Sequence, residues 1–105
     1  MKNDRIRVTL FNKTYKEIDL SDFSVIEEEL FSNRDDIVSV TLPMGVKVIG
    51  ANAFEYCRRL EEVVFPDSLE RIEKEAFLNC NNLKKAELPK GVVVDPTAFK
   101  GCINI

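Results

Sequence analysis

The chain of 105 residues contains no histidine and no tryptophan. Without histidine it cannot build a serine–histidine–aspartate triad, a histidine-ligated metal site or an imidazole switch near neutral pH. It also lacks any apolar run near the roughly 18 residues of a membrane helix, and its first ten residues alternate charged with apolar side chains. We therefore expect no membrane contact and a cytoplasmic location, or an extracellular one if the chain is a fragment of a larger surface protein.

Neither sign of charge is in large excess. Fifteen lysines and arginines stand against 18 aspartates and glutamates, which gives a net charge of −3. This balance argues against direct binding of nucleic acid. The length and the 45% hydrophobic content are enough for one modest core, so we expect a single structural domain.

An internal repeat of 23 residues organises the last two thirds of the chain. The copies are residues 37–59, 60–82 and 83–105, and the third is one residue short from about Val93. Each copy places apolar residues, a proline, an Ala-Phe pair and a cysteine at the same positions. The aligned columns are Ile37, Leu60 and Leu83; Val40, Val63 and Ala86; Leu42, Phe65 and Leu88; Pro43, Pro66 and Pro89; Val46, Leu69 and Val92; Phe54, Phe77 and Phe99; and Cys57, Cys80 and Cys102.

The copies have the form L-x-x-V-x-L-P-x-[GS]-V-x-x-I-x-x-x-A-F-x-x-C, which resembles the BspA-like, or Treponema-type, leucine-rich repeat. The resemblance covers about 69 of the 105 residues, and its proline, Ala-Phe and cysteine columns are specific. It implies an α/β repeat solenoid, a short right-handed coil with parallel strands. Members of this family often serve in adhesion and other protein contacts.

The residues themselves predict the same coil. Val63 and Phe65 alternate with polar or outward positions as in an extended strand, and Pro66 ends that strand because it has no N–H for a continuing ladder. We expect residues 75–80 to form a tight helical turn that places Phe77 inside. Since one 23-residue turn cannot bury these side chains alone, the coils must stack with strands about 4.8 Å apart.

Residues 1–36 depart from the repeat and are predicted to form an N-terminal cap on the domain of residues 37–105. Ile6, Val8 and Leu10 alternate, Asn12-Lys13 favours a turn, and residues 15–20 can return, which predicts a β-hairpin. A helix is then expected, capped by Ser21 or Ser24, with Phe23, Ile26, Leu30 and Phe31 on one face. Alternatively, Ile26 and Phe31 align with Ile49 and Phe54, as in a degenerate fourth copy with Arg34 at the cysteine position.

No group of residues predicts catalysis, a metal or a cofactor. The cysteines recur once per copy and fit buried structural positions better than a zinc site or a Cys57–Cys80 disulfide. The acidic runs, residues 27–29 and 35–36, are typical of solvated surfaces rather than of paired catalytic carboxylates. The four glycines form no phosphate-binding loop. We therefore predict a protein that is not an enzyme.

The outward strand positions are the candidate partner-binding site. Charge alternates along the chain: residues 1–36 and the three copies carry −3, +2, −4 and +2, from 6 against 9, 3 against 1, 2 against 6, and 4 against 2 basic and acidic residues. One interpretation is ion pairing between copies, Glu61 and Glu62 with Lys84 and Lys85, and Glu70 with Lys47. The other is a strip that recognises a protein. Its residues are Ser39, Thr41, Glu62, Val64, Lys85 and Glu87.

The predicted function is a non-catalytic module that binds another, unidentified protein through this strip. The alternative is a small acidic inhibitor that occupies a basic groove of a nucleic-acid-handling enzyme, suggested by residues 27–29, 35–36 and 61–62. A third hypothesis is a structural role, since an uncovered last copy invites self-association through its strand edge.

Overall fold

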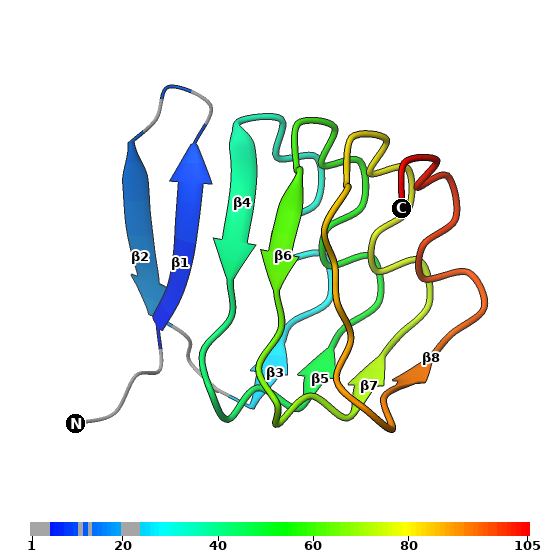
Figure 1. Ribbon diagram of the computed structural model, residues 1–105. Helices are drawn as coiled ribbons and strands as arrows, with labels where there is room; N and C mark the ends of the chain where they lie inside the picture. Colours follow the sequence, from blue (N-terminus) through cyan, green and yellow to red (C-terminus); the bar gives the residue numbers. More distant parts are fainter. Residues whose placement is uncertain (1–4, 11, 13, 20–23) are drawn as a thin grey trace.

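The computed structural model describes residues 5–10, 12, 14–19 and 24–105, and the chain winds through stacked coils (Figure 1). These residues form strands and turns, and none of them is in a helix. In this part of the chain there is accordingly no helix of the length and apolarity needed to span a membrane. The strands are β1 (Arg5–Leu10), β2 (Tyr15–Asp19), β3 (Val25–Ile26), β4 (Ile37–Thr41), β5 (Val48–Ile49), β6 (Glu62–Val64), β7 (Arg71–Ile72) and β8 (Val93–Val94).

Two sheets run along the coils. The front sheet has the order β2-β1-β4-β6, and the back sheet has the order β3-β5-β7-β8. Strands of successive coils are parallel and pair at the repeat spacing, as in Val40 with Val63 and Ile49 with Ile72. The predicted repeat fold with parallel strands is therefore confirmed. We call residues 24–36 the leading coil and residues 37–59, 60–82 and 83–105 the first, second and third coils. The division into two parts at residue 36 stays a prediction.

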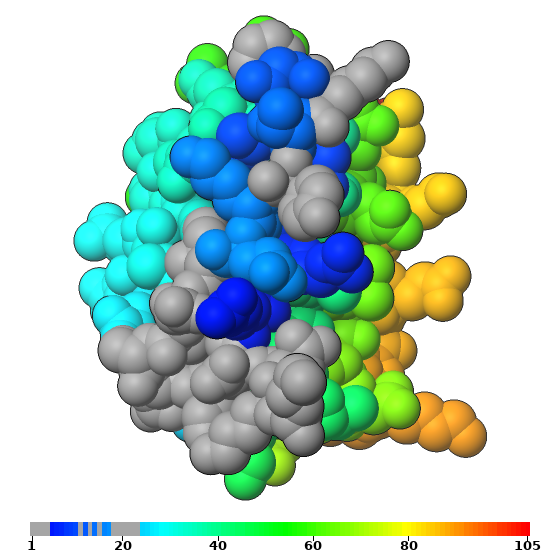
Figure 2. Space-filling view, turned by 90° about the vertical axis from the view of Figure 1, so that its left-hand side faces the viewer, coloured from blue at the N-terminus to red at the C-terminus, as the bar shows by residue number. Residues whose placement is uncertain are grey.

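The predicted hairpin is present at the N-terminal end of the front sheet. β1 pairs antiparallel with β2 and, on its other edge, antiparallel with β4, so that Val8 lies opposite Val40. Ile6 and Val8 are buried in the core. Figure 2 faces this end and shows the blue hairpin lying across it. Lys13 and Leu20, which the prediction included in the hairpin, lie outside the described residues.

The predicted helix cap is wrong. Where it was expected, residues 25–26 form β3, which pairs with β5, and residues 27–33 form turns. The amides of Glu29 and Phe31 donate to carbonyls of the first coil, Ala51 and Ala53, so they are not available for a helix ladder. The fourth-copy alternative describes this segment correctly. Ser21 and Phe23 lie outside the described residues.

One column of aromatic rings runs through the coils. The rings of Phe31, Phe54, Phe77 and Phe99 stack in turn with centroids 5.1, 5.0 and 5.1 Å apart. Phe65 meets the edge of Phe77 at 5.9 Å. Phe77 is fully buried, with rings on both sides. The predicted superposition of the aromatic positions from coil to coil is thus confirmed.

The turns that carry these rings are not helical, in contrast to the prediction for residues 75–80. In the leading, first and second coils two positions of this turn adopt the left-handed conformation, as at Glu75 with φ 54° and Asn79 with φ 58°. Left-handed residues interrupt a right-handed helical turn and let the chain expose its amides to the next coil. The third coil uses Gly101 at the second position, where a Cβ would collide with the Asn79 side chain.

Truncation of the central ring tests the stacked core. We expect Phe77→Ala to lower the free energy of unfolding by about 3–5 kcal/mol, because it leaves a cavity between two rings. Phe99→Ala should cost less, since Phe99 is only partly buried. Denaturant unfolding followed by circular dichroism measures both losses. Equal losses for the two variants would contradict a column whose centre is its most enclosed part.

Candidate functional site

The six residues predicted to bind a partner lie side by side on the front sheet. Ser39 pairs with Glu62 and Thr41 with Val64 across β4 and β6. Glu62 then pairs with Lys85 of the third coil through an isolated bridge. Their inward neighbours Val40 and Val63 are buried, so the alternation of each strand turns the six side chains outward. We call the surface formed by Ser39, Thr41, Glu62, Val64, Lys85 and Glu87 the strip.

The hairpin widens the strip, which the repeat alone did not reveal. The strip has two rows of paired positions, one through Ser39, Glu62 and Lys85 and one through Thr41 and Val64. β1 continues both rows, because Thr9 lies opposite Ser39 and Arg7 lies opposite Thr41. Glu17 of β2 follows beside Arg7. The charge alternation of residues 5–10 was a signal of an outward face, but the register that aligns this face with the strip is set only by the contact between β1 and β4.

The charges of the strip do not pair with each other. The structure places Glu62 opposite Lys85, and the amide of Glu70 donates to the carbonyl of Lys47. In the described part of the chain, however, no ion pair joins either couple or joins Glu61 to Lys84. The predicted pairing between coils is therefore wrong. Long exposed side chains lose as much entropy as they gain in attraction when they pair, so neighbouring positions alone do not produce a bond.

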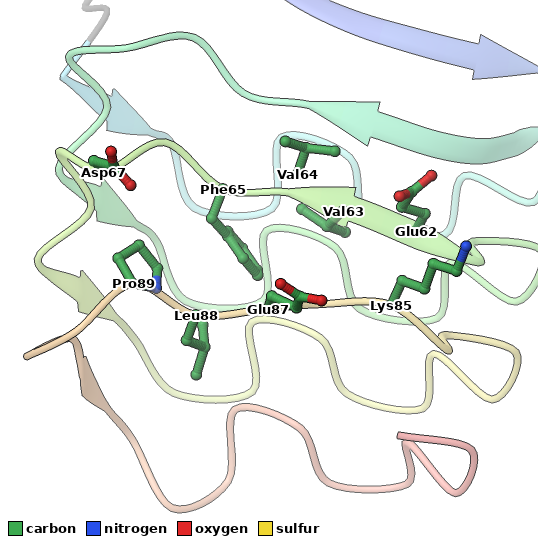
Figure 3. A pocket seen from close by; sticks show the side chains of 9 residues that line it. All are labelled: Glu62, Val63, Val64, Phe65, Asp67, Lys85, Glu87, Leu88 and Pro89. Atoms are coloured by element: carbon green, nitrogen blue, oxygen red, sulfur yellow. The ribbon is translucent and has the colours of Figure 1, made fainter.

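A hollow of about 380 Å³ opens at the edge of the strip, between β6 and the third coil (Figure 3). Val64 and Leu88, which are 45% and 41% exposed, contribute apolar surface to it. Phe65 points into the space between the two chain segments. The full lining is Glu62, Val63, Val64, Phe65, Asp67, Lys85, Glu87, Leu88 and Pro89. Sequence reasoning found four of these residues as outward positions but did not predict a hollow.

The hollow exists because the third coil separates from β6 after Lys85. The small Ala86 takes the place of Val40 and Val63 in its column and is only partly buried. Leu88 is exposed where the equivalent Leu42 is buried. An inward valine anchors the other coils, and alanine removes part of that apolar burial. Residues 86–92 accordingly form no strand.

The three cysteines are buried, reduced and hydrogen bonded to the neighbouring coil. The thiols of Cys57, Cys80 and Cys102 donate to the carbonyls of Phe31, Phe54 and Phe77 at 3.2, 3.1 and 3.1 Å. None forms a disulfide. Hydrogen bonding with the thiols of Cys102 and Cys57, together with burial, raises the pKa of the Cys80 thiol. A neutral, enclosed thiol such as that of Cys80 is a poor nucleophile, whereas the hydrogen bond with Cys80 lowers the pKa of the Cys102 thiol. All three thiols bond to the neighbouring coil, so this column serves the packing of the coils.

Arg34 occupies the cysteine position of the leading coil and turns to a local partner. Its guanidinium donates two hydrogen bonds to the carboxylate of Asp36, at 2.9 and 3.0 Å. These bonds lower the pKa of the Asp36 carboxyl. Within the described residues, no three histidine, cysteine, aspartate or glutamate side chains are grouped to hold a metal ion.

Comparison with known proteins identifies relatives of the same architecture. Residues 2–105 match the family described as "BspA type Leucine rich repeat region (6 copies)". The match includes residues 2–36, which precede the three copies apparent in the sequence. No curated protein matches the chain.

Solved structures agree with this assignment. A leucine-rich repeat protein from Bacteroides ovatus is 32% identical, with a TM-score of 0.75 over 78% of this chain and 22% of its own. One from Bacteroides capillosus is 31% identical, with a TM-score of 0.71 over 94% of this chain and 67% of its own. The leucine-rich repeat protein of T. pallidum, 24% identical with a TM-score of 0.61 over 77% of this chain and 49% of its own, shares the fold. The chain thus spans about a fifth of the Bacteroides ovatus protein.

The raised pKa of Cys80 predicts a loss of stability in alkali. Its ordinary value is 9.0, so above about pH 9 the thiol ionises in the unfolded chain but stays protonated in the folded one. The contribution of Cys80 is complete below that pH and is lost progressively above it, whereas the smaller, downward shift in the pKa of Cys102 acts in the opposite direction. Chemical unfolding between pH 7 and pH 10.5 measures this decline. Cys80→Val removes the thiol, so its decline should be shallower, and identical slopes would refute the assignment.

Proposed function

The chain belongs to the BspA-type leucine-rich repeat family, and we propose that it is a non-catalytic module that binds another protein through the strip. The single observation that carries this proposal is that opposed charges of the strip, Glu62 and Lys85, lie on adjacent coils without an ion pair in the described structure. Their hydrogen-bonding capacity is therefore available to a partner.

The support beneath the strip favours recognition without rearrangement. Val40 and Val63 lie on the inward side of the same strands and are buried, which holds the backbone of the outward residues in place. A surface that is rigid before binding loses little conformational entropy in the complex. The mechanism is the display of fixed side chains on a stacked scaffold.

The hairpin supplies width that the three repeat copies lack. Neighbouring strands of a sheet are about 4.8 Å apart, so the three repeat copies give a surface about 14 Å wide. With β1 and β2 included, five neighbouring segments give a width of about 24 Å. A standard protein interface buries about 800 Å² on each partner. Arg7, Thr9 and Glu17 are therefore part of the proposed contact surface, in register with the strip.

The acidic-inhibitor alternative has no specific support. Glu27, Glu28 and Glu29 follow β3 of the back sheet, whereas Glu62 lies on β6 of the front sheet. The acidic residues that suggested an inhibitor thus come from different sheets, and no observation favours a basic groove as their partner.

Charge reversal on the strip tests the proposed function. We expect Glu62→Lys with Lys85→Glu to reduce capture of the native partner at least ten-fold in affinity purification followed by mass spectrometry, because each reversed charge faces its former complement. The melting temperature should be almost unchanged, since both side chains are on the surface.

The matched control reverses charges on the same molecule away from the strip. Glu70→Lys with Lys74→Glu changes two exposed residues of the second coil and should leave capture at the wild-type level. Equal capture by the strip variant and the control would eliminate the strip as the binding surface.

The third coil is a candidate surface for contact between copies of the chain. Val93, Ile103 and Ile105 are 65%, 79% and 57% exposed there, and exposed apolar side chains favour association. Self-association through this coil stays a prediction. Light scattering should show a mass above that of the monomer, and Ile105→Asp should lower it to the monomer. A monomeric wild type at high concentration would exclude this contact.

A further inference from the structure

The front sheet contains a split in its hydrogen-bond ladder. Between β4 and β6 the ladder extends past the strand end, where the amide of Leu42 donates to the carbonyl of Val64 at 3.0 Å. Between β6 and the third coil, the amide of Lys85 donates to the carbonyl of Glu61 at 3.1 Å, and the amide of Val63 donates to the carbonyl of Lys85 at 2.9 Å. The amide of Lys84 also donates to Glu61, at 2.9 Å, but after Lys85 the described residues form no further bond of this ladder. The ladder therefore stops where the hollow begins.

Both sides of the split present backbone groups in alternation. Because the amide of Val63 faces the third coil, its carbonyl and the amide of Phe65 face the same way. Across the hollow, Glu87 is the position equivalent to Val64, whose carbonyl accepts from the amide of Leu42 between the preceding coils. The equivalent groups of the preceding coils bond to each other, whereas the carbonyl of Val63, the amide of Phe65 and the amide and carbonyl of Glu87 have no partner in the described structure. Unpaired backbone groups at a sheet edge are a template for another strand.

The side chains around the split select the chemistry of the occupant. Glu62, Asp67 and Glu87 contribute three carboxylates to the lining, against the one ammonium of Lys85. Phe65 and Leu88 supply apolar surface to the same lining. A phosphate or other anion would meet repulsion from the carboxylates. A cationic side chain with an aliphatic stem can cover the apolar surface and reach a carboxylate with its charged end.

We propose that the split between β6 and the third coil binds an extended peptide segment of the partner, one that alternates basic and apolar residues. The peptide adds its backbone to the open groups at Val63, Phe65 and Glu87, and its side chains use the hollow and the carboxylates. Strand addition of this kind takes its affinity from main-chain bonds and its specificity from alternate side chains. The volume of about 380 Å³ lies in the range of small binding sites. This inference rests on the proposed function, since it names the partner's chemistry at one edge of the strip.

Titration with defined peptides tests the inference on the whole chain. The probe is a blocked pentapeptide of alternating lysine and valine, added to the ¹⁵N-labelled protein while amide signals are recorded. We expect saturable shifts at the amides of Phe65 and Glu87. A glutamate–valine pentapeptide should bind at least ten-fold more weakly because of its charge. The lysine–valine peptide with N-methylated backbone amides should also bind at least ten-fold more weakly, because it cannot donate main-chain bonds.

Two variants at one position separate backbone from side-chain recognition. Glu87→Pro removes the open amide, which supports no bond of the folded chain, and should abolish the shifts at Phe65. Glu87→Gln keeps the amide and removes one carboxylate, and should weaken binding only a few-fold. Unfolding curves verify that both variants fold. Undiminished binding of the N-methylated peptide, shifts confined to another surface, or no saturable shift would each overturn the inference.

A failure of this inference can be distinguished from a failure of the proposed function. If partner capture depends on Glu62 and Lys85 but the peptide causes no shift at Phe65 and Glu87, the strip binds its partner without strand addition. If the peptide binds at the split but capture ignores the strip charges, the strip is not the binding surface for that partner, and the split acts as a peptide site by itself.

Discussion

The stacking of one coil on the next is the interaction on which the rest of the structure depends. Each coil is too short to bury its own aromatic ring, and Phe77 becomes enclosed only because Phe54 and Phe99 lie above and below it. The amide of Phe77 donates to the carbonyl of Ala98 in the next coil at 2.7 Å. Burial of the ring and satisfaction of the backbone are thus achieved by the same contact.

The need of each coil for a neighbour also explains how the hairpin and the third coil differ from the coils between them. At the N-terminal end, β1 pairs with β4 and buries Ile6 and Val8, so the front sheet is extended and its outward face widens. In the third coil, Ala86 provides a smaller anchor and Leu88 stays exposed. The ladder consequently opens beside β6. One scaffold therefore has a closed, well-supported surface and an adjacent edge with free backbone groups, which is the combination that the two functional proposals use.

The repeat and the core columns could be predicted from the sequence because each depends on local alternation and on a period that recurs within the chain. The helix expected near Ser24 shows the limit of that reasoning. Ile26 and Phe31 fit both a helical face and a degenerate coil, and the choice depended on bonds to Ala51 and Ala53, more than twenty residues away. The ion pair expected between Glu62 and Lys85 does not form for a related reason, because adjacency in the sheet does not fix the positions of the charged ends of long side chains.

The sequence by itself determined the period of 23, the inward columns that end in Phe and Cys, and the six outward positions of the strip, because side-chain direction follows from strand alternation. Tertiary structure decided the rest. The register of β1 against β4 placed Arg7 and Thr9 in line with the strip, and the separation of the third coil left the backbone of Phe65 and Glu87 open. Hydrogen-bond partners of backbone groups are chosen by the position of distant segments, and every residue offers the same amide and carbonyl, so the sequence carries no local sign of which groups will remain unpaired.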